Sequence, residues 1–276
     1  RANVRFNPTE DINLRLSYSS GFRAPQAFDE DLHIAAVGGE VALIRLAENL
    51  KEEKSQSLSA SVDFYHRFAG GIQVNFLAEG FYTNLSDVFV LEDVGRDDQG
   101  NLLKERRNGS GARVGGLTLE GKTVLTSWLS LQAGFTLQRS RYKEAEKWSS
   151  DETVAAESRM FRTPDYYGYF TSTLTPLKRF TASLSGTYTG RMLVQHLAGY
   201  IPADRTVTTP DFFDLNIKLA YEFPLYDELA LEVSAGVQNI FDAYQSDFDQ
   251  GKNRDSAYIY GPGSPRSYFA GAKIRF

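Results

Sequence analysis

The chain has 276 residues, 24% of them charged and 13% aromatic, with a formal net charge of -5 and no cysteine. The negative charge leaves no basic footprint for nucleic acid, so we exclude nucleic-acid binding. No apolar run approaches the roughly 20 residues that a membrane-spanning helix needs, so we also exclude a helical membrane protein. The absence of cysteine fits any compartment and disfavours only a small domain stapled by disulfides.

Alternation of apolar and polar residues with a period of two begins at the first residues and predicts strands in chain order. Ile12, Leu14 and Leu16 alternate with Asn13, Arg15 and Ser17. Several segments hold this alternation for ten or more residues, close to the 9 to 11 that cross a bilayer at a tilt, whereas strands of soluble sandwiches average about 5 to 6. We therefore reject a soluble β-sandwich. The alternating segments are 2–6, 12–19, 57–64, 72–77, 129–138, 180–188, 213–222 and 268–276.

The connections between these segments alternate between short and long. Short links fall at 7–11, 69–71, 125–127, 175–179 and 224–228, and long polar links at 20–52, 92–110, 142–161, 190–210 and 243–264. Short turns at one rim and long loops at the other are typical of outer-membrane barrels, in which the long loops are extracellular.

Charged residues on the polar parity of the predicted strands support this interpretation. An Arg or Lys facing lipid at mid-bilayer costs about 2 to 4 kcal/mol, so these side chains are predicted to face the lumen. Aromatic residues near strand ends on the apolar parity predict two interfacial girdles. The predicted lumen charges are Arg15, Asp63, Glu79, Glu120, Lys122, Asp214, Lys218, Glu222, Glu232, Lys273 and Arg275. The predicted girdle residues are Phe6, Tyr18, Phe64, Tyr82, Trp128, Tyr188, Tyr221, Phe241, Tyr268 and Phe276.

Three motifs carry a family resemblance. Gly-Phe-Arg-Ala-Pro at 21–25 opens the longest loop, Asn-Ile-Phe-Asp at 239–242 ends the penultimate strand, and the chain stops on Phe276. Together they resemble the C-terminal half of TonB-dependent outer-membrane receptors of the siderophore, haem or cobalamin type. The resemblance implies an all-β, antiparallel transmembrane β-barrel of which this chain supplies about eleven of roughly 22 strands. Residues 1–276 would be the C-terminal part of one barrel domain, with the plug domain and N-terminal strands outside this chain.

The same resemblance implies a function. A receptor of this kind in the bacterial outer membrane captures a ferric siderophore or haem and imports it with energy from a TonB-type coupling protein, which engages an N-terminal segment. Its other partners would be outer-membrane lipid and the N-terminal half with its plug. Edge strands invite pairing, so we expect the first and last strands to pair with the rest of the barrel. Cobalamin and carbohydrate import stay open, as do a passive porin without a plug and an adhesin.

Arg, His and Tyr side chains in the long loops are the candidates for binding an anionic iron chelate or ligating haem iron. No cofactor, metal site or catalytic residue is predicted, because no nucleophile and base occur together in a recognised motif, and we expect no enzyme activity. The acidic stretch 92–101 lacks the spacing of an EF-hand and is predicted to be a turn rather than a calcium site. The candidate ligand-binding residues are Arg23, His33, Arg191, His196, Tyr200, Tyr258, Tyr260 and Arg266.

Overall fold

One antiparallel sheet dominates the molecule. The computed structural model describes residues 1–25, 42–149 and 151–276. Eleven strands follow one another across the sheet in the described residues, and β10 (Glu157–Arg159) adds to β9. The predicted all-β fold with about eleven strands is thereby confirmed. The strands are β1 (Ala2–Phe6), β2 (Ile12–Arg23), β4 (Glu53–Arg67), β5 (Gln73–Ser86), β8 (Ala112–Thr126), β9 (Leu129–Glu146), β11 (Tyr166–Leu177), β12 (Phe180–Thr189), β15 (Phe212–Tyr226), β16 (Leu229–Gln238) and β17 (Ser267–Arg275).

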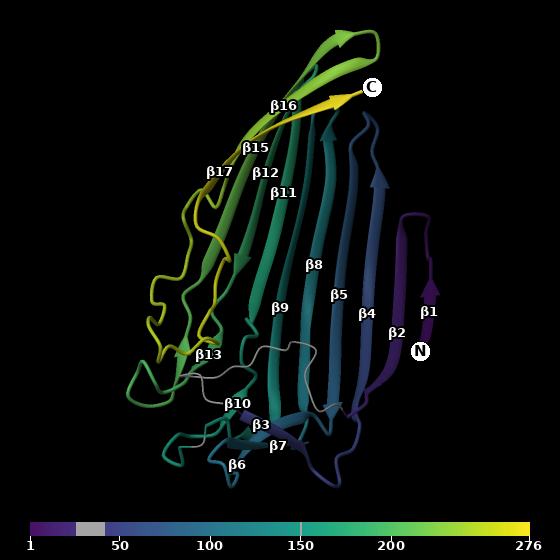
Figure 1. Ribbon diagram of the computed structural model, residues 1–276. Coiled ribbons are helices and arrows are strands. Elements are labelled where there is room, and N and C mark those ends of the chain that lie inside the picture. The colour runs from purple at the N-terminus through teal and green to yellow at the C-terminus, as the bar shows by residue number, and fades with distance from the viewer. Residues whose placement is uncertain (26–41, 150) are drawn as a thin grey trace.

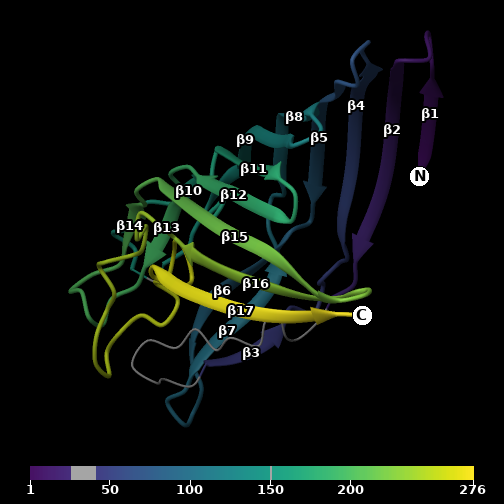
Figure 2. The same ribbon diagram turned by 90° about the horizontal axis from the view of Figure 1, so that it is seen from above.

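The sheet forms a tall curved wall with two different ends. Short turns join strands at one end, and the long connections gather at the other (Figure 1). Seen from above, the wall is an open curve with β1 at one margin and β17 at the other (Figure 2). We call these ends the short-turn end and the loop end.

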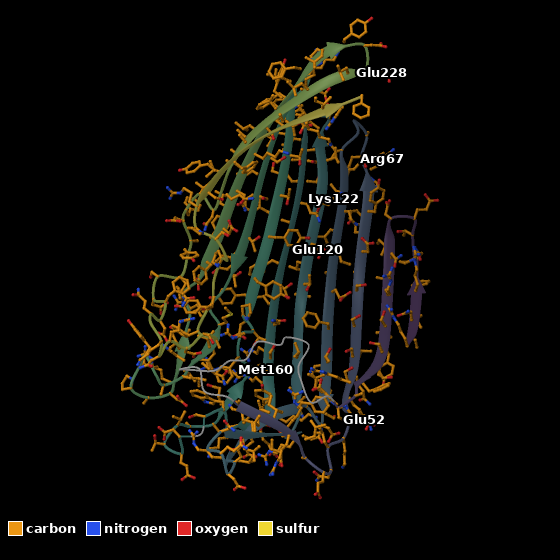
Figure 3. All side chains as sticks on the ribbon, in the orientation of Figure 1. Glu52, Arg67, Glu120, Lys122, Met160 and Glu228 are labelled. Atoms are coloured by element: carbon orange, nitrogen blue, oxygen red, sulfur yellow. The ribbon has the colours of Figure 1, made fainter. Side chains whose placement is uncertain are left out.

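The pairing register separates a polar from an apolar face. Arg15 lies opposite Ser61, and Ser61 lies opposite Glu79. Followed strand by strand, the register places every predicted lumen charge on this one face. Two of these charges lie on β8, Glu120 near its middle and Lys122 nearer the short-turn end (Figure 3). The predicted division of the strands into two faces is confirmed.

Ion pairs and glycine-aromatic contacts tie neighbouring strands together on the polar face. Arg275 donates to Glu222 at 3.0 Å and to Glu232 at 2.7 Å, which joins β15, β16 and β17. The Tyr169 ring lies over Gly134, where an added Cβ would be 2.5 Å from Tyr169 Cε1. Gly134 is therefore required by the close approach of a ring from the neighbouring strand.

Two of the predicted long loops contain hairpins of their own. The 92–110 connection holds most of β6 (Phe89–Arg96) and β7 (Leu102–Asn108), and β7 also pairs in parallel with β3 (Ala42–Leu46). The 190–210 connection holds a hairpin of β13 (Leu193–His196) and β14 (Arg205–Thr208). These connections are therefore more regular than their polar composition suggested, and Leu193 and Val194 are buried in the second of them.

The second half of the acidic stretch, 97–101, forms the predicted turn, and its first half belongs to β6. The Asp97 carboxylate accepts the backbone N–H groups of Gln99 and Asn101 and the Asn101 side-chain amide, closing the link between β6 and β7. The hydrogen bond from the Asn101 side chain is the main cause of a lowered pKa at Asp97.

Among the described residues, none forms a helix long and apolar enough to cross a membrane.

Candidate functional site: a packed loop platform

The long connections at the loop end have a hydrophobic core of their own. Val194 of the β13–β14 hairpin packs with Phe212, at the start of β15, and with Tyr258 and Tyr260 of the last connection. Tyr258 is only 2% exposed. Segments about 60 residues apart in sequence thus pack as one unit, which we call the loop platform: residues 191–212 and 243–264.

Hydrogen bonds to one carboxylate fix both tyrosines. Tyr258 Oη donates to Asp247 Oδ2 at 2.7 Å, and Tyr260 Oη donates to Asp247 Oδ1 at 2.6 Å. Burial opposes ionisation of Asp247, but its hydrogen bonds, first among them those from Tyr260 and Tyr258, together outweigh burial and lower its pKa. Burial and the hydrogen bond to Asp247 raise the pKa of Tyr260 to about 12, and the same causes raise that of Tyr258.

A titration tests this arrangement. The pKa of Tyr260 rises from 10.0 to about 12 on folding. The contribution of Tyr260 to the free energy of unfolding is therefore complete below pH 10.0 and is lost as the pH rises through about 12. For Asp247 the contribution is lost as the pH falls through its lowered pKa, below 3.8. In an alkaline titration we expect a phase at high pH in the tyrosinate absorbance at 295 nm. Tyr260→Phe should make this late phase smaller, and Asp247→Asn should move it to lower pH. A late phase unchanged in Asp247→Asn would contradict the assignment.

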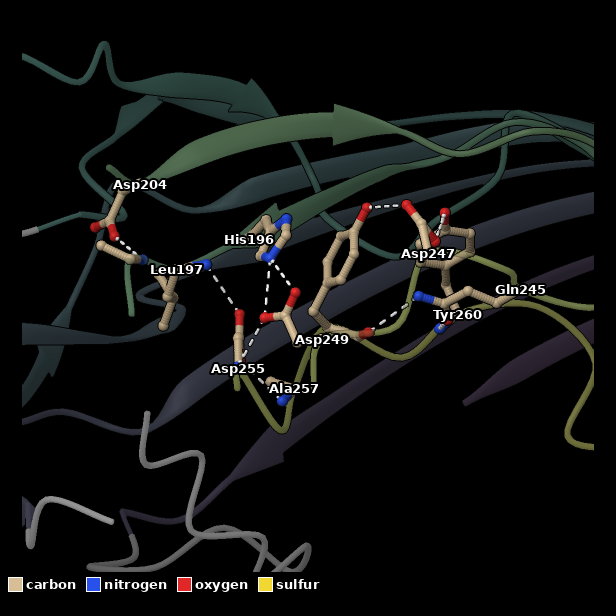
Figure 4. Close-up of polar contacts among 11 residues, drawn as sticks. His196, Leu197, Asp204, Gln245, Asp247, Asp249, Asp255, Ala257 and Tyr260 are labelled. Atoms are coloured by element: carbon tan, nitrogen blue, oxygen red, sulfur yellow. Dashed lines mark hydrogen bonds and ion pairs between the residues drawn. The ribbon is translucent and has the colours of Figure 1, made fainter. Parts of the chain in front are cut away.

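His196 forms the centre of a second buried network (Figure 4). Its side chain is 4% exposed, and Nε2 lies 3.0 Å from both carboxylate oxygens of Asp249, whose side chain is 2% exposed. The imidazole also stacks on Tyr258 with ring centroids 3.6 Å apart. Nδ1 is buried and has no hydrogen-bond partner in the described residues. The tautomer that donates from Nε2 is therefore the one that fits this site.

Asp255 and Asp204 extend the network to backbone groups. Asp255 accepts the N–H groups of Leu197 and Ala257 and donates its own N–H to Asp249 Oδ2. Asp204 accepts from Ala198 N and from Ser149 Oγ, which brings in the connection after β9. Each carboxylate is thus used to hold a turn in place.

Arg162, in the connection after β10, also holds the platform in place. Its guanidinium donates to the carbonyl oxygens of Ile259, at 2.8 Å, and of Ala257. The sequence alone did not single out Arg162, Asp204 or Asp255, because each has a partner far away in the chain: Ile259, Ser149 and Leu197 respectively. The positive φ of 58° at Arg162 is the local sign of an unusual backbone there.

The predicted ligand residues fall into two groups. His196, Tyr258 and Tyr260 are buried and bonded to protein groups, whereas Arg23, Arg191, Tyr200 and Arg266 are exposed. Tyr200 is 54% exposed in the link between β13 and β14, and Arg191 is bonded to Asp211 at 3.2 Å. Arg23 lies 5.7 Å from the centre of the Phe89 ring, away from the platform. His33 lies outside the described residues.

A cavity of about 580 Å³ lies on the polar face beneath the last connection. Its lining includes polar side chains of β12, β15 and β16, such as Asp214, Lys218 and Gln238, together with Phe269 and the segment 262–265. The described residues contain no group of three His, Asp or Glu side chains arranged to hold a metal ion.

The comparison with protein families decides the class of this molecule. Residues 1–240 match the model described as TonB dependent receptor-like, beta-barrel. The chain belongs to this family of TonB-dependent receptors. A comparison with curated protein sequences gives no match.

Solved receptors share this receptor chain's fold. The ferric enterobactin receptor PfeA from Pseudomonas aeruginosa superposes with a TM-score of 0.66 at 17% identity, covering 98% of this chain and 39% of PfeA. The siderophore receptor PirA from Acinetobacter baumannii gives 0.63 at 17% identity, with 98% and 40% covered. The ferric-catecholate import receptor Fiu from E. coli K12 gives 0.62 at 17%, with 98% and 34% covered. The chain therefore spans about two fifths or less of these receptors' length.

Proposed function

We propose that this chain is the ligand-facing part of an outer-membrane receptor that captures a ferric siderophore and imports it with TonB-coupled energy. The observation that supports this proposal most strongly is the family match over residues 1–240. The loop platform at one end of the wall adds to it. The similar structures include ferric-catecholate and ferric enterobactin receptors, which supports an iron chelate as the cargo.

The exposed side chains of the loop end suit an anionic chelate. Arg191, Tyr200 and Arg266 offer guanidinium and phenol groups to carboxylate or catecholate oxygens. In this proposal His196, Tyr258 and Tyr260 position the platform instead of contacting cargo. His196 is buried, so in this proposal it is not an axial ligand for haem iron.

The remaining partners follow from the two faces of the wall. The apolar face would contact outer-membrane lipid. The charged polar face would line the lumen and contact a plug domain carried, with the other strands, by the N-terminal half of the receptor. The N-terminal half would also contain the segment that binds the TonB-type coupling protein. On this proposal residues 1–276 are the C-terminal part of one barrel domain.

Uptake by the full-length receptor tests the function. In a strain that lacks its own siderophore receptors, the receptor is expected to restore accumulation of ⁵⁵Fe supplied as a ferric siderophore, and removal of the coupling protein is expected to abolish it. Haem and cobalamin are tested in parallel. Uptake of none of the three would refute the proposal, and solute entry that persists without coupling energy would instead indicate a passive porin.

Variants of the exposed loop residues refine this test. Arg191→Ala with Tyr200→Ala is expected to weaken siderophore binding by roughly tenfold or more, because a charge-assisted contact and an aromatic contact are lost. Lys178→Ala, an exposed residue at the short-turn end, is the matched control.

A further inference from the structure

Arginines and serines share a hollow on the polar face of the wall, at its β1–β2 margin. Arg5 of β1 lies directly opposite Arg15 of β2, and both side chains are exposed. With Arg1 they line a hollow of about 530 Å³, whose other side chains include Glu79 and four serines of β2 and β4. We call Arg5 and Arg15 the arginine pair. The four serines, which we call the serine column, are Ser17, Ser19, Ser57 and Ser59.

The serine column leads from the loop end of the wall to the arginine pair. Ser19 lies opposite Ser57, and Ser17 lies opposite Ser59. Strand β2 runs from the short-turn end to the loop end, so the serines lie nearer the loops than Arg15 does (Figure 1). Residues on one face of a strand are about 6.8 Å apart, so the path from Ser19 through Ser17 to Arg15 covers about 14 Å.

The charge of the arginine pair is poorly balanced by the protein. Arg5 donates to Asn7 Oδ1 at 3.0 Å and lies against the amide of Asn13, and both partners are neutral. Arg15 has no hydrogen bond or ion pair in the described part of the chain. Glu79 lies two strands from Arg15, about 10 Å away. Like charges directly opposite in an antiparallel pair are destabilising, so the pair favours an anion from outside these strands.

An arginine elsewhere on the same face is neutralised by its neighbours. Arg275 of β17 donates to Glu222 and to Glu232. Arg5 and Arg15 have no such carboxylates in contact with them among the described residues. The polar face therefore carries uncompensated positive charge at its β1–β2 margin and compensated charge at its β15–β17 margin.

We propose that this hollow is an internal site on the path of an anionic iron chelate through the lumen. A chelate released at the loop end moves along the serine column and is received by the arginine pair. Guanidinium groups bind carboxylate or catecholate oxygens in a bidentate manner. Serine hydroxyls both donate and accept weak hydrogen bonds, which suits passage, because a conducting path must admit a solute and also release it. The inference rests on the proposed function and adds to it a site beyond the loops.

Uptake and surface binding by the full-length receptor, measured separately, test the proposal. PfeA is a ferric enterobactin receptor, so ⁵⁵Fe-enterobactin is the probe. Arg5→Gln combined with Arg15→Gln is expected to lower the maximal uptake rate roughly tenfold or more, because the field that concentrates the anion in the lumen is weakened. The Kd of the chelate on cells without the coupling protein is expected to stay unchanged, which also shows that the variant is folded.

A matched control and a charge series accompany this variant. Lys122→Gln with Lys273→Gln removes the same charge from the same face and is expected to change neither the rate nor the Kd. Lys at both positions of the arginine pair is expected to retain most of the rate, and Glu at both to lower it further than Gln does. A purely structural role does not produce that order.

Three results would overturn the inference. The first is an unchanged uptake rate in the Arg→Gln variant. The second is a Kd weakened by the same factor as the rate, which would place the arginine pair in the outer binding site. The third is greater entry of vancomycin into cells that carry the Arg→Gln variant and lack the coupling protein, which would show that the pair holds an acidic segment of the plug.

Uptake by the unchanged receptor separates this inference from the proposed function. If the unchanged receptor imports no ferric enterobactin, the proposed cargo and the internal site are refuted together. If it imports the chelate and the Arg→Gln variant does so equally well, only the internal site is refuted.

Discussion

Leu119→Arg is expected to destabilise the folded receptor by about 2 to 4 kcal/mol, the cost of placing Arg against lipid at mid-bilayer. Leu119 lies at the middle of β8, between Ala78 and Phe135 on the neighbouring strands of the apolar face. Its neighbour Glu120 lies on the polar face. Glu120→Arg is therefore expected to change the free energy of unfolding by less than about 1 kcal/mol.

Reversible urea unfolding of the full-length receptor in lipid vesicles, followed by tryptophan fluorescence, measures both variants. The two substitutions introduce the same side chain at adjacent positions, so a cost at 119 that is absent at 120 identifies the face that meets lipid. Equal costs at 119 and 120 would mean that the two faces have been wrongly assigned.

Asp249→Ala is expected to release the loop platform without unfolding the barrel. The substitution leaves His196 Nε2 and Asp255 N without their acceptor in a buried site, and such losses cost about 3 kcal/mol. Because the platform has its own core, this loss should lower the free energy of local opening of the platform and leave that of global unfolding unchanged.

Hydrogen exchange of residues 193–208, together with limited proteolysis, measures that opening. Asp98→Ala removes an exposed carboxylate from the β6–β7 turn and provides the control. Faster exchange is expected at 193–208 in Asp249→Ala alone, with an unchanged global transition. Unaltered exchange there would show that the His196–Asp249 contact does not hold the platform closed.

The strands were predictable because the rule that governs them is local. Leu14 and Arg15 face opposite sides whatever the rest of the chain does, so alternation alone assigned the faces that the register confirms. The connections obey no such rule. His196 and Tyr258 are of the residue types that bind iron ligands, yet contacts formed across some 50 residues bury them.

The same limit explains the residues that were missed. Arg162 and Asp255 look like ordinary loop charges, and their roles depend on backbone groups of segments that only folding brings near. The strands β6 and β7 were missed for a different reason. Polar residues such as Glu92 and Lys104 suggested a solvated loop where a hairpin forms.

The shared core of the platform has a consequence for how such a recognition surface can vary. The β13–β14 hairpin and the last connection supply opposite halves of one interior, Val194 from the first and Tyr258 from the second. A graft of either segment alone from a related receptor would pair mismatched halves. Changes in specificity made by exchanging loops should therefore succeed when both segments are transferred together, while substitutions at exposed positions such as Tyr200 are free to occur singly.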